Sequence, residues 1–253
     1  MEKSDALLLF AFSLPPEKAI EFLRKKGYKI SWDWTDLWQE AHAKAFTVAK
    51  VMKLDLLQDI KSEVDKAIQN GMTLEEFRSA VEPIMRLKGW WGKVRASEVP
   101  GFEAAPGRDP NKEVLLGSPR RIKTIYRVNM QTSYSTGRYK GLLDLVPYRP
   151  YWQYLQIQRK TKRHDHSLLH EKIFMWDDPI WSKVYPPNGF FCGCRVVSLT
   201  EAELKERGLK VTKGSEVDFT PDEGWNYNPG EASFTIDESK YYKDLLEKYK
   251  SAA

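Results

Sequence analysis

The spacing of apolar residues predicts helices in the first part of the chain. Residues 13–17 are typical of a helix start, with proline in the first turn, and the apolar stripe that follows ends near Gly27. Apolar residues then recur at steps of three and four over residues 33–70, which predicts one long second helix. Thr73 and Glu76 form the pattern of a capping box, so a third helix is expected over residues 73–87.

The middle of the chain alternates between a loop and a helix. Glycine and proline occur throughout residues 89–116, which predicts a loop without regular structure. Ser118 and Pro119 then favour a new helix start, and apolar residues follow at helical spacing. A hinge at Pro147 and Pro150 is expected to end this helix.

Short strands and turns are expected in the remainder. Aromatic and β-branched residues favour strands over 151–157 and 195–198, with a turn at 186–189. A short helix over 200–208 and an amphipathic helix over 237–250 complete the pattern. The class is therefore α+β: a helical N-terminal half with a loop (1–110), followed by a mixed C-terminal domain with short strands, turns and a terminal helix (111–253).

Composition agrees with an ordinary globular protein, since 42% of the 253 residues are hydrophobic and 30% are charged. No run of about 20 apolar residues is present, so a membrane partner is not expected. Two cysteines only one residue apart indicate a reducing compartment. The high aromatic content is typical of interfaces, and we interpret the tryptophans at 32, 34 and 38 as either an exposed docking anchor or internal core.

Positive charge is concentrated in one segment of the chain. Residues 112–163 hold twelve Lys or Arg and only two acidic residues, whereas the whole chain has a net charge of +5. Such a block indicates either a contact surface for DNA or an acidic partner, or a solvated basic face. The candidate contact residues lie in the predicted helix: Arg120, Arg121, Lys123, Arg127 and Arg138.

Residues 163–195 hold the candidate metal ligands. His166 and His170 are four residues apart, so a helical turn would place them on one face, and Cys192 and Cys194 follow a strong turn signal. Two imidazoles and two thiolates are a ligand set for tetrahedral structural zinc. The alternative is a cluster of reduced cysteines and hydrogen-bonded histidines without metal. In both versions, the His166 and Cys192 side chains are expected within about 10 Å of each other, the reach of one shared ion.

No catalytic residue is assigned. The chain lacks H-E-x-x-H, a deaminase-like P-C-x-x-C, a phosphate-binding glycine loop and G-x-S-x-G. Asp177 and Asp178 precede a proline and are expected to cap a turn, with Arg163 or Arg195 pairing with them. A zinc-dependent enzyme stays an alternative, because three protein ligands plus water would leave a position for chemistry, whereas four indicate a structural ion.

Several ordered blocks in residues 115–232 resemble the Mu F-like head morphogenesis family. They are R-x-x-H-x-x-L-H at 163–170, D-D-P-x-W at 177–181, Y-P-P-N-G at 185–189, C-x-C-R at 192–195 and the flanking blocks at 124–139 and 224–230. The sequence departs from the family at Glu171, where a glycine is usual. The motif residues are Arg163, Asp177, Asp178, Trp181, Pro186, Pro187, Asn188, Gly189 and Arg195.

The resemblance implies that residues 111–253 are a head morphogenesis module of a minor capsid protein from a tailed phage. It implies a role in procapsid assembly or in DNA packaging and delivery, at the portal and the head interior. The implied partners are a portal protein, a major capsid or scaffolding protein and packaged DNA. The implied location is the phage head, assembled in the cytoplasm of a bacterial host. A sequence-independent DNA-binding module is the second alternative.

Overall fold

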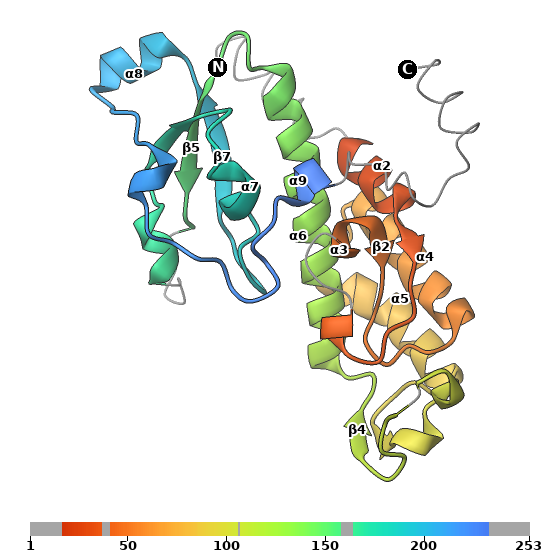
Figure 1. The fold of residues 1–253 in the computed structure, drawn as a ribbon. Helices are drawn as coiled ribbons and strands as arrows, with labels where there is room; N and C mark the ends of the chain where they lie inside the picture. The colour runs from red at the N-terminus through yellow and green to blue at the C-terminus, as the bar shows by residue number, and fades with distance from the viewer. Residues whose placement is uncertain (1–16, 37–40, 106, 158–163, 233–253) are drawn as a thin grey trace, which may run out of the picture.

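A 26-residue helix, α6 (Pro119–Asp144), is the axis of the molecule (Figure 1). The computed structural model describes residues 17–36, 41–105, 107–157 and 164–232. Helix α6 begins as predicted: Pro119 occupies the first turn and the Ser118 hydroxyl accepts a hydrogen bond from the Arg121 N–H. Helices lie on one side of α6 and a three-stranded sheet lies on the other, so the predicted α+β class is confirmed.

The N-terminal helices pack on each other and on α6. They are α2 (Glu17–Lys25), α4 (Leu54–Asn70) and α5 (Leu74–Leu87). The predicted capping box at the start of α5 is present, with Thr73 and Glu76 each satisfying the other's backbone N–H. Helix α2 crosses α6 at Gly137, where an added Cβ would lie 3.0 Å from the Ala19 nitrogen. Glycine permits this close approach without displacing α2.

The predicted continuous helix over residues 33–70 is wrong. This stretch instead holds the 3-10 helix η1 (Trp34–Asp36), α3 (Ala41–Lys44) and β2 (Ala45–Phe46), which pairs with β1 (Gly27–Tyr28), before α4 begins at Leu54. The Asp36 carboxylate accepts the N–H groups of Trp32 and Asp33 at 2.7 and 2.8 Å, which favours a local turn over a helix. The apolar residues in between, such as Val48 and Val51, are buried although the backbone that carries them is irregular.

The predicted loop over residues 89–116 contains regular structure. Strands β3 (Lys93–Arg95) and β4 (Glu113–Leu115) form an antiparallel pair, with the 3-10 helices η2 (Ala96–Glu98) and η3 (Phe102–Ala104) between them. Trp90 precedes the pair, is almost fully buried and donates from Nε1 to the Lys50 carbonyl at 2.7 Å. The segment therefore belongs to the N-terminal core, which extends from Ala19 to Ile125.

The C-terminal part is built on the antiparallel sheet β6-β5-β7, with β5 (Tyr151–Leu155) in the centre. Its neighbours are β6 (Ile173–Met175) and β7 (Arg195–Leu199), and the strands predicted at 151 and 195 are confirmed. Alternate residues of β5, Trp152 and Tyr154, are fully buried. Four short helical segments complete the module: α7 (Trp181–Val184), α8 (Glu201–Arg207), η5 (Gly214–Glu216) and α9 (Pro229–Ala232).

Helix α9 and the C-terminal sheet both lie against α6, so the long helix joins the two cores (Figure 1). In the part of the chain that the structure describes, no helix is long and apolar enough to span a bilayer. The predicted terminal helix over residues 237–250 and the Trp38 anchor lie outside the described residues. The predicted division between residues 110 and 111 stays a prediction.

Candidate metal centre

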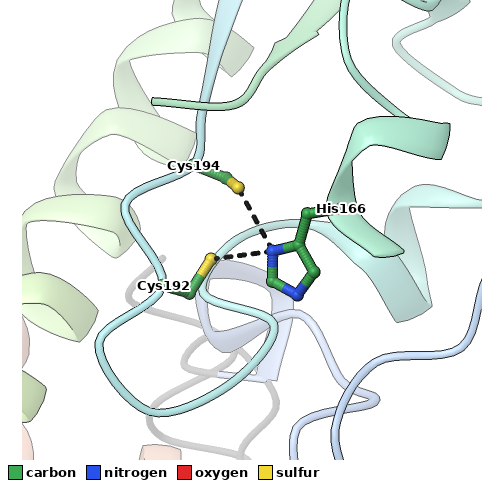
Figure 2. A group of neighbouring side chains, drawn as sticks. All are labelled: His166, Cys192 and Cys194. Atoms are coloured by element: carbon green, nitrogen blue, oxygen red, sulfur yellow. Dashed lines mark hydrogen bonds between the residues drawn. The ribbon is translucent and has the colours of Figure 1, made fainter. Parts of the chain in front are cut away.

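Three of the four predicted ligands converge in the C-terminal core (Figure 2). His166 lies in the 3-10 helix η4 (Asp165–Leu168), and the cysteines lie in the loop before β7. The His166 Nδ1 atom lies 3.3 Å from the Cys194 Sγ atom and 3.6 Å from the Cys192 Sγ atom. His166 and Cys192 are buried, and Cys194 is partly buried. The proximity of His166 and Cys192 that the sequence predicts is confirmed.

The motif Y-P-P-N-G at 185–189 anchors the loop that carries the cysteines. The Asn188 side chain is fully buried and donates to the Tyr154 hydroxyl at 2.9 Å and to the Val184 carbonyl at 2.8 Å. The bond between Pro186 and Pro187 is cis. Pro186, Pro187 and Gly189 are also buried, and the Pro186 carbonyl accepts a hydrogen bond from the Ser135 hydroxyl on α6. These contacts fix the loop against α6 and β5.

Gly193, between the two cysteines, lies close to the Ile157 side chain. A Cβ at this position would lie 2.6 Å from the Cγ2 atom of Ile157, which is closer than a real contact allows. Glycine at position 193 therefore lets the loop that carries both cysteines pass close to Ile157.

Electrostatics favour a thiolate at Cys192. The Cys194 thiol beside it lowers the pKa of Cys192 most, and the His166 ring and the backbone N–H groups of Asn188 and Cys194 lower it further, against the effect of burial. The pKa of Cys194 is raised, chiefly because an ionised Cys192 lies next to it. The pair thus gives up its first proton from Cys192, and a thiolate is the form that binds metal.

The distances fit a tetrahedral ion. With the usual zinc bond lengths, a nitrogen and a sulfur ligand of one tetrahedral zinc lie about 3.5 Å apart. The measured separations of 3.3 and 3.6 Å bracket this value, and all three ligand atoms lie within 4.8 Å of one another. Among the described residues no carboxylate belongs to the group.

His170 is not part of the cluster, although the sequence predicts it as the fourth ligand. Its Nδ1 atom accepts a hydrogen bond from the Gln156 N–H at 3.2 Å. The physical reason is that residues 165–168 form a 3-10 helix, with three residues per turn, so positions 166 and 170 do not share a face. Phe219, which the sequence analysis did not single out, instead packs its ring edge-on against His166, with centroids 5.4 Å apart.

Glu171 adopts the left-handed backbone conformation, with φ of 64°. This is the position where the sequence departs from the family's usual glycine. The strained turn redirects the chain from η4 into β6, and the Glu171 N–H donates to the Tyr154 carbonyl at 2.8 Å. The tight turn is therefore kept without glycine, at the cost of backbone strain.

We predict that Glu171→Gly stabilises the protein. A left-handed non-glycine residue costs about 1–2 kcal/mol, and the greater freedom of glycine in the unfolded chain offsets part of the gain. The net increase in the free energy of unfolding is expected to be about 0.5–1 kcal/mol, measured by urea denaturation. Lys172→Gly, one residue along and outside the left-handed region, is the matched control and should destabilise the protein. Equal effects of the two variants would contradict a strained turn at Glu171.

The remaining motif residues have structural contacts. The Asp178 carboxylate accepts the N–H groups of Ile180 and Gly214, both at 2.9 Å, which agrees with the predicted turn role. Among the described residues, no ion pair joins Arg195 to Asp177 or Asp178; Arg195 is exposed at the start of β7, and Asp177 is also exposed. Trp181 packs in the aromatic core on Trp152. Arg163 lies outside the described residues.

The basic candidates of α6 fall into two groups. Arg120, Lys123, Arg127 and Arg138 are exposed, and no ion pair joins any of them to a described carboxylate. Arg121 is different, because its guanidinium is largely buried, stacks on Trp90 and donates to the carbonyls of Leu115 and Ala49. Burial lowers the pKa of Arg121 to about 10. Arg121 therefore serves the N-terminal core and is not a surface contact residue.

Fold and site together define an α+β protein whose C-terminal module is organised around a buried His-Cys-Cys cluster. Residues 58–197, more than half of the chain, match the family described as Phage Mu protein F like protein. The chain belongs to this family.

Two relatives extend the match. The chain is 39% identical to the putative capsid assembly protein F of Escherichia phage Mu, over 92% of this chain and 58% of the relative. It is 36% identical to the Mu-like prophage FluMu F protein of Haemophilus influenzae, over 82% of this chain and 55% of the relative. The chain thus spans little more than half the length of these relatives. No solved structure matches it.

Proposed function

We propose that this chain is a minor capsid protein that acts in phage head morphogenesis. The observation that carries the proposal is the 39% identity, across 92% of the chain, to a protein named putative capsid assembly protein F. We further propose association with the portal and the head interior, where the chain aids procapsid assembly or DNA packaging and delivery. A portal protein and a major capsid or scaffolding protein are the proposed partners, and the phage head assembled in the host cytoplasm is the proposed location.

Within this role, the His166, Cys192 and Cys194 cluster is proposed to hold a structural zinc ion. The ion would link η4 to the loop before β7, two segments that the sequence separates by more than 20 residues. The buried position and the absence of a carboxylate from the group among the described residues favour structure over hydrolysis, which needs a base beside the metal-bound water. A metal link of this kind contributes folding free energy directly.

The exposed basic residues of α6 favour DNA contact as a second role. Arg120, Arg127 and Arg138 are separated by seven and eleven residues, close to two and three full turns, so they lie on one face of the helix. Lys123 lies one turn from Arg120 on the same face. The four cations form a stripe about 27 Å long. Cations that lie in a line and pair with no described carboxylate are suited to phosphate contacts that carry no sequence information.

We predict that replacing the four stripe cations with glutamine weakens DNA binding. Each phosphate contact contributes about 0.9 to the slope of log affinity against log salt for duplex DNA, so the slope should fall by up to about 3–4. Fluorescence anisotropy with a labelled duplex at several salt concentrations measures this. The matched control replaces four exposed cations that already pair with carboxylates: Lys25, Arg78, Arg86 and Lys205. An equal loss in both variants would show that only net charge matters and would reject the stripe.

The main proposal is tested by purifying heads from the phage or prophage that encodes the chain. The proposal requires the chain to be present in purified heads at low copy number relative to the major capsid protein. A chain found only outside the particles would reject it.

A further inference from the structure

A cavity of about 430 Å³ lies where several parts of the chain meet, and Phe190 of the loop that carries the cysteines is among its lining residues. Helix α6, the segment around β2 and the C-terminal segment before α9 line it. Most of the lining is apolar and includes Phe46, Val128 and Trp225. None of the three cluster residues lines it. Its volume falls in the range of about 300–1,000 Å³ that small-ligand sites in proteins occupy.

Lys26 lines this apolar cavity, and its ammonium group has no acidic partner among the described residues. The residue is only 8% exposed, and its Nζ atom lies 4.7 Å above the Phe22 ring. Among residues 17–36, 41–105, 107–157 and 164–232, no carboxylate and no hydrogen-bond acceptor contacts this Nζ atom. Lys61, the neighbouring buried lysine, differs because its Nζ atom donates to the carbonyls of Arg24 and Lys26. Burial and then the charge of Lys61 lower the pKa of Lys26 to about 7.

A second residue with a polar group, Tyr227, lines the same cavity. Tyr227 is buried, and burial raises the pKa of its phenol, with no described hydrogen-bond partner to oppose the effect. The phenol O–H is thus a donor beside the cavity, in addition to the ammonium of Lys26. Neither donor has a hydrogen-bond acceptor among the described residues, so both can donate to a ligand in the cavity.

The charge of the lining is positive. The cavity is lined by Lys26, Lys50, Arg121 and a single carboxylate, Asp33, which already pairs with Lys50 at 3.0 Å and with Arg108 outside the cavity. Arg121 donates to backbone carbonyls and has no described carboxylate partner. The cavity therefore combines apolar walls with two cations that no acid neutralises.

We propose that this cavity is a binding site for an apolar ligand that carries one carboxylate. The carboxylate accepts hydrogen bonds from the Lys26 ammonium and the Tyr227 phenol, and the apolar body lies against Phe46, Val128 and Trp225. Binding supplies the acceptor that both buried donors lack in the described structure. The shared chemistry is an aromatic or aliphatic carboxylate, presented by a small molecule or by the end of a polypeptide.

The test compares two probes that differ only in charge, naphthaleneacetate and its neutral amide. Both are titrated into the full chain by calorimetry, with quenching of tryptophan fluorescence as a second readout because Trp225 lines the cavity. We expect one acid bound per chain and an amide that binds at least about tenfold more weakly, since hydrogen bonds to charged groups are the stronger ones. Equal affinities for the acid and the amide would overturn the proposal. It would also be overturned if neither probe binds and the peptide acid described below does not bind either.

Three variants assign the effect to the site. Lys26→Met is expected to bind the acid and the amide with equal affinity. Tyr227→Phe, which removes one oxygen, is expected to reduce the difference between the two affinities. Lys29→Met, an exposed lysine three residues along, is the matched control and should behave as the native protein does. If the acid still binds more tightly than the amide in Lys26→Met, the proposal fails.

A peptide ending in phenylalanine with a free carboxylate, and its C-terminal amide, distinguish the source of the ligand. Binding of naphthaleneacetate points to a small molecule, whereas Lys26-dependent binding of the peptide acid alone points to a polypeptide end. None of these outcomes depends on whether the chain enters phage heads, so the proposal and the head role are tested separately.

Discussion

A chain in which Cys192 and Cys194 are both replaced by serine is expected to lose zinc binding and most of its stabilisation by zinc. The native protein should bind one ion per chain, because three ligand atoms already stand at tetrahedral separations. At a free zinc concentration about 1,000-fold above the dissociation constant, binding stabilises the native state by about 4 kcal/mol. For a chain of this size that corresponds to a melting temperature higher by about 8–16 °C.

Elemental analysis and thermal melting with and without chelator measure these effects. His170→Ala distinguishes the ligand set with His170 from the set without it. The sequence predicts His170 as a ligand, whereas in the structure its Nδ1 atom accepts a hydrogen bond from the Gln156 N–H. This variant should keep its zinc, whereas His166→Ala should lose it. His164→Ala, at an exposed position, is the control for histidine loss in general. If the native protein contains no zinc and its melting temperature is unchanged by added zinc, the zinc proposal is rejected and the site is a reduced Cys-His cluster without metal.

A stop codon early in the gene is expected to reduce the yield of infectious particles to background. The proposed role makes the chain a component that the assembly of the head requires. Plaque titre and electron microscopy of lysates measure the loss, and the defect should appear in heads while tails remain normal. The intact gene supplied from a plasmid should restore the titre.

The same complementation connects the candidate metal centre to assembly. A plasmid carrying the Cys192→Ser, Cys194→Ser variant should fail to restore the titre, because the loop before β7 loses its link to η4. Glu171→Gly, which relieves strain without touching the cluster, is the matched variant and should restore it. Normal particles in the absence of the chain would contradict a role in head morphogenesis.

Local rules in the sequence predicted much of the fold. The capping boxes at Thr73 and Thr200, the proline start of α6 and the alternation around Trp152 each depend on residues close together in the chain. Such short-range signals are read directly from sequence, because the partners lie within one turn or one strand. The proximity of His166 to Cys192 was also predictable, because the turn at 186–189 directs the loop back.

Other features depended on contacts that no local pattern reveals. The prediction of a helix over residues 33–70 was wrong because side chains with the spacing of Val48, Val51 and Met52 can be buried by irregular backbone as well as by a helix. The pairing of β3 with β4 joins residues about 20 positions apart across glycine- and proline-rich sequence. Arg121 looked like its exposed neighbours in sequence, and only the tertiary position of Trp90 removes it from the surface.

The cavity beside Lys26 was not predictable from the sequence for the same reason. Lys26 follows Lys25 near the end of an amphipathic helix, where an exposed lysine is ordinary. Lys26 lines the same cavity as Tyr227, about two hundred residues later in the chain. A single sequence contains no signal for an association over that separation.

The central claim is that this chain is a component of the phage head, and quantitative mass spectrometry of purified heads tests it most directly. Heads are purified from the encoding phage, and peptides of the chain are counted against those of the portal and the major capsid protein. We expect the chain at a fixed ratio to the portal protein, far below the major capsid protein, and absent from separated tails. Heads that are complete and contain no such peptides would contradict it.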